Sequence, residues 1–390
     1  MILKSIKYSQ FDNTPQEWKL ERFTLGNINL IVGKNSTGKT KALNIIKNLA
    51  YMLSGDRKLT YVEGDYSVSL TKGKKKINYI LEYHNNKIVK EKLVIDNVTK
   101  LSRAAKGEGK IYYEKLQKDV AFQTPQNELA CISRMDKIQH PFLVDLYNWG
   151  NSLRHYYFGS DLGQNSMLLM TKGGIDDITQ EPNPRDPNNV VTFFKKGLKK
   201  AGTEFLQSIF EDMKTVGFHI KDIDTAVPKN IKWQPGLPGL TGIAGEPYSL
   251  TVRENDLKCI TEQRQMSQGM FRCLSLIIQI EYSLLIGKPS CILIDDIGEG
   301  LDFERSSALI KLLTNKAEDT FIQLIMATND RFVMNAMPLK YWSVIQRIGN
   351  ISRIYNYRNS RELFNRFELT GLNNFDFFSS QYYLGDAGTN

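Results

Sequence analysis

The chain has few cysteines and histidines, which limits the chemistry it can perform. Its 390 residues include four of each, and neither set shows the spacing of metal ligands. We therefore expect neither a zinc site nor a histidine-based nuclease centre. Cys259, Cys273 and Cys291 lie in apolar stretches, where a reduced thiol packs as a small hydrophobe. This usage predicts a reducing, cytoplasmic compartment.

Long apolar runs, internal repeats and heptad patterns are also missing. No stretch approaches the roughly 18 consecutive apolar residues that span a bilayer, and the N-terminus lacks the form of a signal peptide. We therefore expect no membrane partner. The net charge of +9 leans only mildly toward nucleic acid, because the lysines are spread along the chain and the densest clusters are 71–76 and 195–200. DNA stays open as a partner, and solvated surface lysines are the alternative.

The order of the expected elements indicates an α/β fold. A short apolar strand at 28–32 runs into a glycine-bounded loop, which is followed by apolar residues at helical spacing. Alternating patterns from 61 to 96 predict a small antiparallel sheet with a turn at 84–86. Strands and helices alternate after residue 245, which is typical of a parallel sheet with crossover helices. Between them lie two predicted helices, at 143–158 and 194–213, and proline- or glycine-rich breaks at 178–190 and 234–247.

The segment GKNSTGKT, residues 33–40, matches the phosphate-binding P-loop pattern and has a strand before it and a helix after it. Backbone N–H groups of such a loop cradle phosphates, Lys39 reaches the β and γ phosphates, and the Thr40 hydroxyl suits Mg²⁺. A plain structural turn is the weaker alternative. The pattern predicts ATP and Mg²⁺ as ligands without saying what hydrolysis drives. The expected nucleotide-binding residues are Gly33, Lys34, Asn35, Ser36, Thr37, Gly38, Lys39, Thr40 and Lys41.

Two downstream segments carry further polar groups at the ends of predicted elements. MSQGM, residues 266–270, places a serine before a long helix, where it could be an ordinary N-cap or part of an anion site. ILIDDIGEGLD, residues 292–302, places Asp295 and Asp296 at the end of an apolar strand, where paired aspartates form a turn, cap a helix or bind a cation.

Together with the P-loop, these segments resemble the ABC-type ATPase head, in the branch that includes the SMC, RecF and OLD families. The resemblance implies a P-loop NTPase fold with a mixed central sheet, a small antiparallel β subdomain and a helical insert. It also implies that Asp295 holds Mg²⁺ and that Asp296 stands where a glutamate usually polarises the attacking water. The signature residues, which contact ATP across a dimer interface, would be Ser267, Gln268 and Gly269; the D-loop would be Gly300, Leu301 and Asp302; the switch would be Thr328 and Asn329.

The resemblance covers the two ends of the chain. It divides the sequence into an N-terminal part of the ATPase core at 1–109, a helical insert at 110–244 and a C-terminal part of the core with the tail at 245–390. Lys39 and Ser267 are 228 positions apart, which is too long for a transporter cassette and too short for an SMC arm. Gln123 and Gln126 are candidates for the family's glutamine-loop residue. The aromatic tail, NNFDFFSSQYY, is expected either to pack on the core or to dock a partner.

Two departures from the family pattern favour a switch over a fast motor. Asp296 is one methylene shorter than glutamate, and positioned bases are sensitive to displacements of about 1 Å. Asn329 replaces a histidine and cannot titrate. The resemblance therefore implies a slow ATPase that forms a homodimer or higher oligomer around ATP and controls a separately encoded effector, as in bacterial antiviral systems. The alternative is a RecF-like repair ATPase that binds DNA across the closed dimer.

Overall fold

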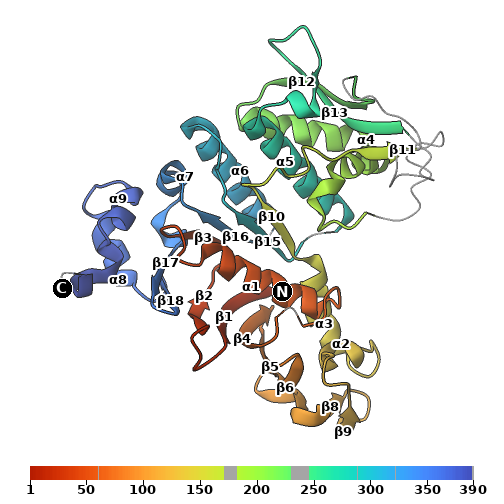
Figure 1. Cartoon of the computed structure of the whole chain (residues 1–390), viewed down its shortest axis with the longest axis vertical. Helices are drawn as coiled ribbons and strands as arrows, with labels where there is room; N and C mark the ends of the chain where they lie inside the picture. The colour runs from red at the N-terminus through yellow and green to blue at the C-terminus, as the bar shows by residue number, and fades with distance from the viewer. Residues whose placement is uncertain (60, 171–181, 230–245, 288, 321, 389–390) are drawn as a thin grey trace. The chain divides into compact units, whose positions relative to one another are not determined.

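The computed structural model describes residues 1–59, 61–170, 182–229, 246–287, 289–320 and 322–388. The chain divides into two compact units (Figure 1). Unit 1 comprises Met1–Arg154, Ser290–Asp295 and Ala317–Asn390, and unit 2 comprises His155–Pro289 and Asp296–Lys316. The predicted breaks at 178–190 and 234–247 lie partly or almost wholly outside the described residues.

Unit 1 is built on one long mixed sheet. Its strands follow the order β15-β16-β3-β17-β18-β2-β1-β4-β5-β6-β7-β8-β9. The strands are β1 (Ile2–Gln10), β2 (Trp18–Thr24), β3 (Ile28–Val32), β4 (Gly64–Lys72), β5 (Lys75–His84), β6 (Lys87–Ile95), β7 (Val98–Arg103), β8 (Glu108–Tyr113), β9 (Lys118–Gln123), β15 (Cys291–Asp295), β16 (Gln323–Thr328), β17 (Trp342–Ile348) and β18 (Ile351–Asn356). The helices are α1 (Lys39–Leu53), α2 (Ala130–Ser133), α3 (Pro141–Ser152), α7 (Arg331–Ala336), α8 (Arg361–Glu368) and α9 (Asn374–Ser379).

The strands β15, β16, β3 and β17 are parallel, as the alternation of strands and helices predicts. All residues of β15, β3 and β16 are buried, which is the usual state of strands covered on both faces. α1 packs beside these strands, and α3 packs on α1 so closely that a Cβ on Gly150 would lie 2.5 Å from the Ala50 carbonyl oxygen. This half of the sheet carries the P-loop.

The other half, β4 to β9, is antiparallel and is drawn in orange tones in Figure 1. Asn85 and Asn86 join β5 to β6 with φ of 51° and 57°, which confirms the predicted turn. The sheet continues beyond the predicted boundary at 109, because β8 and β9 extend it strand by strand. The segment expected to open a helical insert is therefore strand structure, and unit 1 reaches Arg154.

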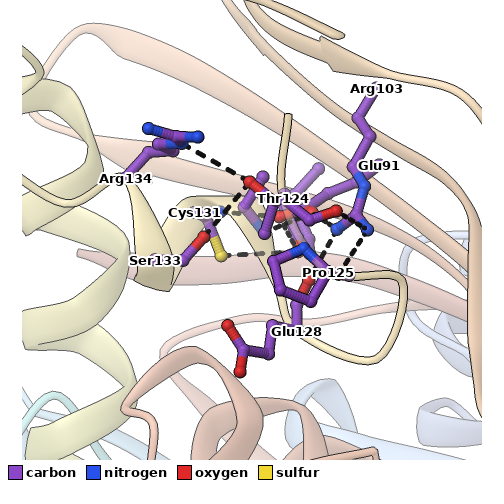
Figure 2. Close-up of polar contacts among 10 residues, drawn as sticks. Glu91, Arg103, Thr124, Pro125, Glu128, Cys131, Ser133 and Arg134 are labelled. Carbon is purple, nitrogen blue, oxygen red and sulfur yellow. Dashed lines mark hydrogen bonds and ion pairs between the residues drawn. The ribbon is translucent and has the colours of Figure 1, made fainter. Parts of the chain in front are cut away.

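A buried ion pair holds the loop after β9 against this sheet (Figure 2). Glu91 and Arg103 have no exposed side-chain surface and approach to 3.6 Å. Glu91 accepts hydrogen bonds from the Tyr79 hydroxyl and from the first two amides of α2, while Arg103 donates to the carbonyl oxygens of Thr124, Pro125 and Glu128. Each of the two charged groups therefore also forms hydrogen bonds to other polar groups. A buried ion pair needs such bonds to offset the loss of hydration.

The aromatic tail forms a small core of its own at the C-terminal end of unit 1. The Phe377 ring on α9 is fully buried and lies 4.5 Å from the Phe364 ring and 5.1 Å from the Phe367 ring, both on α8. Tyr383, in the 3₁₀ segment η6 (Tyr382–Gly388), stacks on Phe378. These contacts support the packing interpretation of the tail.

The cysteines depart in part from the prediction. Cys273 and Cys291 are buried as expected, and burial raises the pKa of the Cys273 thiol to about 12. Cys131 is also buried. The prediction was wrong for Cys259, which is exposed because it follows β13 in a polar turn rather than an apolar stretch.

In the described part of unit 2, three α-helices accompany a small sheet. Strand β10 (Arg154–Tyr157) begins at the unit boundary, and the other elements are β11 (Leu168–Met170), α4 (Val190–Thr215), β12 (Ile220–Ala226), β13 (Glu246–Glu254), β14 (Thr261–Glu262), α5 (Gln268–Ile286) and most of α6 (Phe303–Thr320). α5 is long and apolar enough to cross a membrane by length and composition, although polar residues interrupt it and it is no continuous apolar run. However, 72% of its most apolar window is buried, as in the core helix of a soluble protein.

A partly buried charge cluster joins α4, α5 and α6. The Lys316 ammonium lies 2.9 Å from Asp212 and 2.8 Å from Glu281. Burial raises the pKa of the Asp212 carboxyl to about 6, and the neighbouring Lys316 opposes this shift. Asp212 therefore favours the folded state most when it is protonated.

We expect the stability of unit 2 to fall as Asp212 loses its proton. Its pKa in the unfolded chain is near 3.8, so its contribution is complete below that pH and is lost as the pH rises through about 6, at a cost of up to about 3 kcal/mol. Urea unfolding of the wild type and of Asp212→Asn at about pH 5 and pH 7.5 measures how much the free energy of unfolding depends on Asp212. The variant should lose less stability between the two pH values. Parallel losses in both proteins would contradict the assignment.

Candidate nucleotide-binding site

The site lies in unit 1, where three parallel strands end together. Met326 of β16 pairs with Ile294 of β15, and Thr328 of β16 pairs with Val32 of β3. The P-loop, Asp295 and the switch residues therefore leave the sheet at one edge. Ligands of open α/β sheets bind at this carboxyl edge. The structure thus brings together three of the segments that the sequence predicts.

The P-loop backbone is folded around the Lys39 side chain. The ammonium is buried and donates to the carbonyl oxygens of Gly33, at 2.8 Å, and Lys34, at 3.1 Å. Gly38 has a φ of 106°, which favours glycine. A Cβ on Gly33 would lie 2.7 Å from Thr37 Oγ1 and 2.8 Å from the Ile345 carbonyl oxygen, so only glycine fits. The loop precedes the N-terminus of α1, a favourable place for phosphate.

The sequence does not reveal the residues that support this loop. Ser352 of β18 donates to the Thr37 carbonyl oxygen at 3.1 Å, and the Lys41 ammonium lies 4.0 Å from the centroid of the Trp18 ring. Burial, with a smaller effect of Arg347, lowers the pKa of Lys41 to about 8. These supports come from strands far away in the sequence, and no local pattern marks them.

Asp295 ends β15 with no exposed surface. Burial, with a smaller effect of Arg57, lowers the pKa of Lys47 on α1, and the Asp295 carboxylate opposes this shift. Buried carboxylates are normally paired or bound to a cation. A carboxylate at a strand end and the Thr40 hydroxyl at a helix start are oxygen ligands of the kind Mg²⁺ prefers. Among the described residues no group of three or more His, Cys, Asp or Glu forms a ready-made metal cluster, so a Mg²⁺ ion here would rely on water and phosphate oxygens.

The switch residues lie beside the P-loop. Asn329 Nδ2 donates to Asn35 Oδ1 at 3.1 Å, a bond between two segments 294 positions apart. Thr328 is buried, and its hydroxyl accepts from the Asp330 backbone amide at 3.0 Å. The side chain of Asp330 caps α7 through the amides of Phe332 and Val333. One side-chain hydrogen bond therefore connects the switch directly to the phosphate loop.

The signature and D-loop segments pack together within unit 2. Ser267 caps α5 by accepting from the Met270 amide at 3.3 Å. A Cβ on Gly269 would lie 2.9 Å from the Gly300 carbonyl oxygen and from Leu301, so the glycine permits close contact with the D-loop. Arg272, which the sequence does not single out, donates to the carbonyl oxygens of Glu299, Gly159 and Ser160. Gln268 is exposed at the first turn of α5.

The remaining acidic residues of this segment also belong to unit 2. Asp296 has a φ of 53°, an uncommon value for a residue other than glycine. Asp296 and Glu299 both lie against Gly159, where a Cβ would come 2.4 Å from Glu299 Oε2. Asp302 accepts from the backbone amide and the guanidinium of Arg305, and the amide donation keeps the pKa of its carboxyl below the usual range.

The glutamine-loop candidates are not beside the P-loop. Gln123 ends β9, the last strand of the sheet, and the Gln126 carbonyl oxygen accepts from Ile88. Both lie in the antiparallel half, near the Glu91–Arg103 pair. Strand β9 is separated from β3 by nine other strands, so the sequence-based choice of these two residues was wrong.

Comparisons with known proteins extend this description. A family model described as "AAA domain, putative AbiEii toxin, Type IV TA system" matches residues 28–335. Among solved structures, the SMC head bound to the C-winged helix domain of ScpA is 10% identical, with a TM-score of 0.51 over 91% of this chain and 97% of that one. The SMC head domain from Thermotoga maritima is 14% identical, with a TM-score of 0.45 over 91% and 99%. The first of these matches shows a shared fold and confirms the predicted fold class. No curated protein matches the sequence.

Proposed function

Because the chain belongs to the AAA family described as a putative AbiEii toxin of a type IV toxin–antitoxin system, and is a P-loop ABC-type ATPase of the SMC-like branch, we propose that it is an ATP-controlled switch. In this proposal it binds ATP with Mg²⁺, hydrolyses it slowly and acts on a separately encoded effector in the cytoplasm, in defence against viruses. The family description supports the toxin or abortive-infection setting.

The observation that carries the proposal is the hydrogen bond between Asn329 and Asn35. The γ-phosphate of a P-loop nucleotide is held by the loop and its lysine. A switch side chain already bonded to that loop is placed to change partner when the phosphate arrives or leaves. Asparagine exchanges hydrogen bonds without a change of charge, which suits a switch with two positions.

In the proposed mechanism two chains enclose two ATP molecules. One chain supplies Lys39, Thr40, Asp295 and Asp296 to each pocket, and the other chain supplies the signature segment 267–269. Lys39 holds the phosphates, and Asp296 orients and deprotonates the attacking water. Ser267, at the N-terminus of the 19-residue helix α5, offers a hydroxyl and the helix dipole to the γ-phosphate. ATP-dependent dimerisation of the Asp296→Asn variant tests this arrangement.

The alternative function, a repair ATPase that binds DNA, has one observation in its favour. Strand register places Lys7, Lys92 and Lys110 in one row across the antiparallel sheet, through the successive pairs Lys7–Ser67, Ser67–Ile80, Ile80–Lys92, Lys92–Ser102 and Ser102–Lys110. Directly paired residues share a face of the sheet. Lys7 and Lys110 are exposed and Lys92 is half-buried, so the row could contact phosphates.

If the alternative holds, replacing the three lysines with glutamine should reduce the salt dependence of duplex DNA binding. Each lost phosphate contact reduces the magnitude of the slope of log K against log salt by about 0.9. The magnitude for the triple variant should therefore be smaller by about 1 to 3. Fluorescence anisotropy with a labelled duplex, with and without ATP, measures the slope. A protein that ignores duplex DNA under both conditions would rule out this function.

A further inference from the structure

A second candidate ligand site lies in unit 1 at the opposite end of β3 from the P-loop. It is a groove of about 700 Å³ at the start of β3 and β17, within the size range of small-molecule sites. Its lining includes three cationic side chains, two tyrosines and one exposed amide. These are Lys4, Lys340, Arg358, Tyr341, Tyr357 and Asn27.

The charge of the groove is strongly unbalanced. Lys4, Lys340 and Arg358 face one carboxylate, Glu318, which accepts a hydrogen bond from the Tyr341 hydroxyl at 3.2 Å. Over the described residues, none of the three cations forms an ion pair with a carboxylate. Arg358 is close to the groove floor, because a Cβ on Gly26 would lie 3.4 Å from its Nη2. The groove therefore offers a net charge of +2 to an anion.

The floor of the groove is fixed by buried hydrogen bonds. Gln323, fully buried, donates to the carbonyl oxygens of Leu3 and Gly26 and accepts from the Leu3 amide. Asn29 exchanges hydrogen bonds with the backbone of Gly26, and Asn356 donates to the Thr24 carbonyl oxygen. The Trp342 indole, which forms part of the wall, donates to the Met337 carbonyl oxygen. A site whose backbone is already held in place loses little entropy when a ligand binds.

We propose that this groove binds a free nucleotide, separate from the ATP of the P-loop. The phosphate would lie between Lys340 and Arg358, where charge-assisted hydrogen bonds are strongest. Tyr341 and Tyr357 line the groove with rings of the kind on which bases stack. The Lys340 ammonium lies 4.8 Å from the centroid of the Tyr341 ring, and the Arg361 guanidinium lies 5.5 Å from that of the Tyr357 ring, so a base would stack on the other face of either ring. The exposed Asn27 amide can read a base edge. The end of a nucleic-acid strand carries the same chemistry, so the test must separate the two sources.

The test uses the full chain carrying Lys39→Ala, which weakens the P-loop site. Calorimetry measures binding of AMP, inorganic pyrophosphate and a 5′-phosphorylated single strand of about 12 nucleotides, each at up to about 1 mM. We expect one AMP site, with affinity lowered about tenfold or more by K340Q/R358Q, because the substitution removes both charged donors to the phosphate. The control K74Q/K75Q removes equal charge from the β4–β5 hairpin and should leave AMP affinity unchanged. Tyr357→Leu should weaken AMP more than pyrophosphate.

Three results would overturn the proposal. The first is that no probe binds to a folded protein, with folding checked by thermal unfolding of each variant. The second is equal weakening by K340Q/R358Q and K74Q/K75Q, which would indicate only a general charge effect. The third is that the single strand binds and AMP does not, which would assign the groove to nucleic-acid ends.

Discussion

Replacing Lys39 with alanine is expected to lower ATP hydrolysis by about a hundredfold or more, since loss of one preorganised charge-stabilising group costs about that much. The Lys39 ammonium is buried and already held by the carbonyl oxygens of the loop that it serves. Because this ammonium is already buried, no further loss of its hydration is needed when ATP binds. The variant loses that positive charge. Phosphate release and binding of a fluorescent ATP analogue measure the two effects.

Lys34→Ala is the matched control for this change. Lys34 is also among the expected nucleotide-binding residues, but the contact it makes with Lys39 is through its carbonyl oxygen, which the substitution keeps. Lys34 belongs to the same loop and carries the same charge, but its side chain is exposed. Surface charges are screened by salt, so the control should change the rate by no more than about threefold. Equal activity of the two variants would show that this loop does not act on phosphate through Lys39.

Replacing Glu91 with glutamine is expected to destabilise unit 1 by about 3–5 kcal/mol, the usual cost of removing one partner from a buried ion pair. The substitution leaves Arg103 charged and without exposed surface. It also weakens the acceptor for the Tyr79 hydroxyl and for the first two amides of α2. Urea unfolding measures the loss, and we expect the loop after β9 to become sensitive to protease.

Glu82→Gln is the control for the Glu91 prediction, since it breaks an ion pair between β5 and β6, the strand that also carries Glu91. Glu82 pairs with Lys90 at 2.7 Å, but the two side chains are 32% and 45% exposed. Exposed pairs contribute only about 0.2–1 kcal/mol. If both substitutions lower the free energy of unfolding equally, burial does not determine how much the Glu91–Arg103 pair stabilises the fold.

Local patterns in the sequence predicted those parts of the fold whose physics is local. The buried strand at 28–32, the P-loop and the parallel order after residue 245 follow from apolar periodicity and glycine positions, and the structure has them. The Asn85–Asn86 turn follows from the tolerance of asparagine for positive φ.

Features that depend on distant pairing could not be predicted in this way. Nothing near Glu91 in the sequence marks Arg103 or the loop after β9 as its partners. The boundary at 109 was misplaced because β8 and β9 are short and their alternation is weak. The Asn35–Asn329 bond and the contacts of Trp18 and Ser352 with the P-loop region likewise depend on strand order.

The central claim is that ATP holds two copies of this chain together, and sedimentation of Asp296→Asn tests it most directly. Without the carboxylate that we propose to activate the water, ATP should persist in the site. The variant should therefore sediment as a dimer with ATP and Mg²⁺ and as a monomer with ADP. Adding Ser267→Arg, which places a bulky side chain at the α5 N-terminus, should return it to a monomer in ATP. A variant that binds ATP yet remains monomeric would contradict the account.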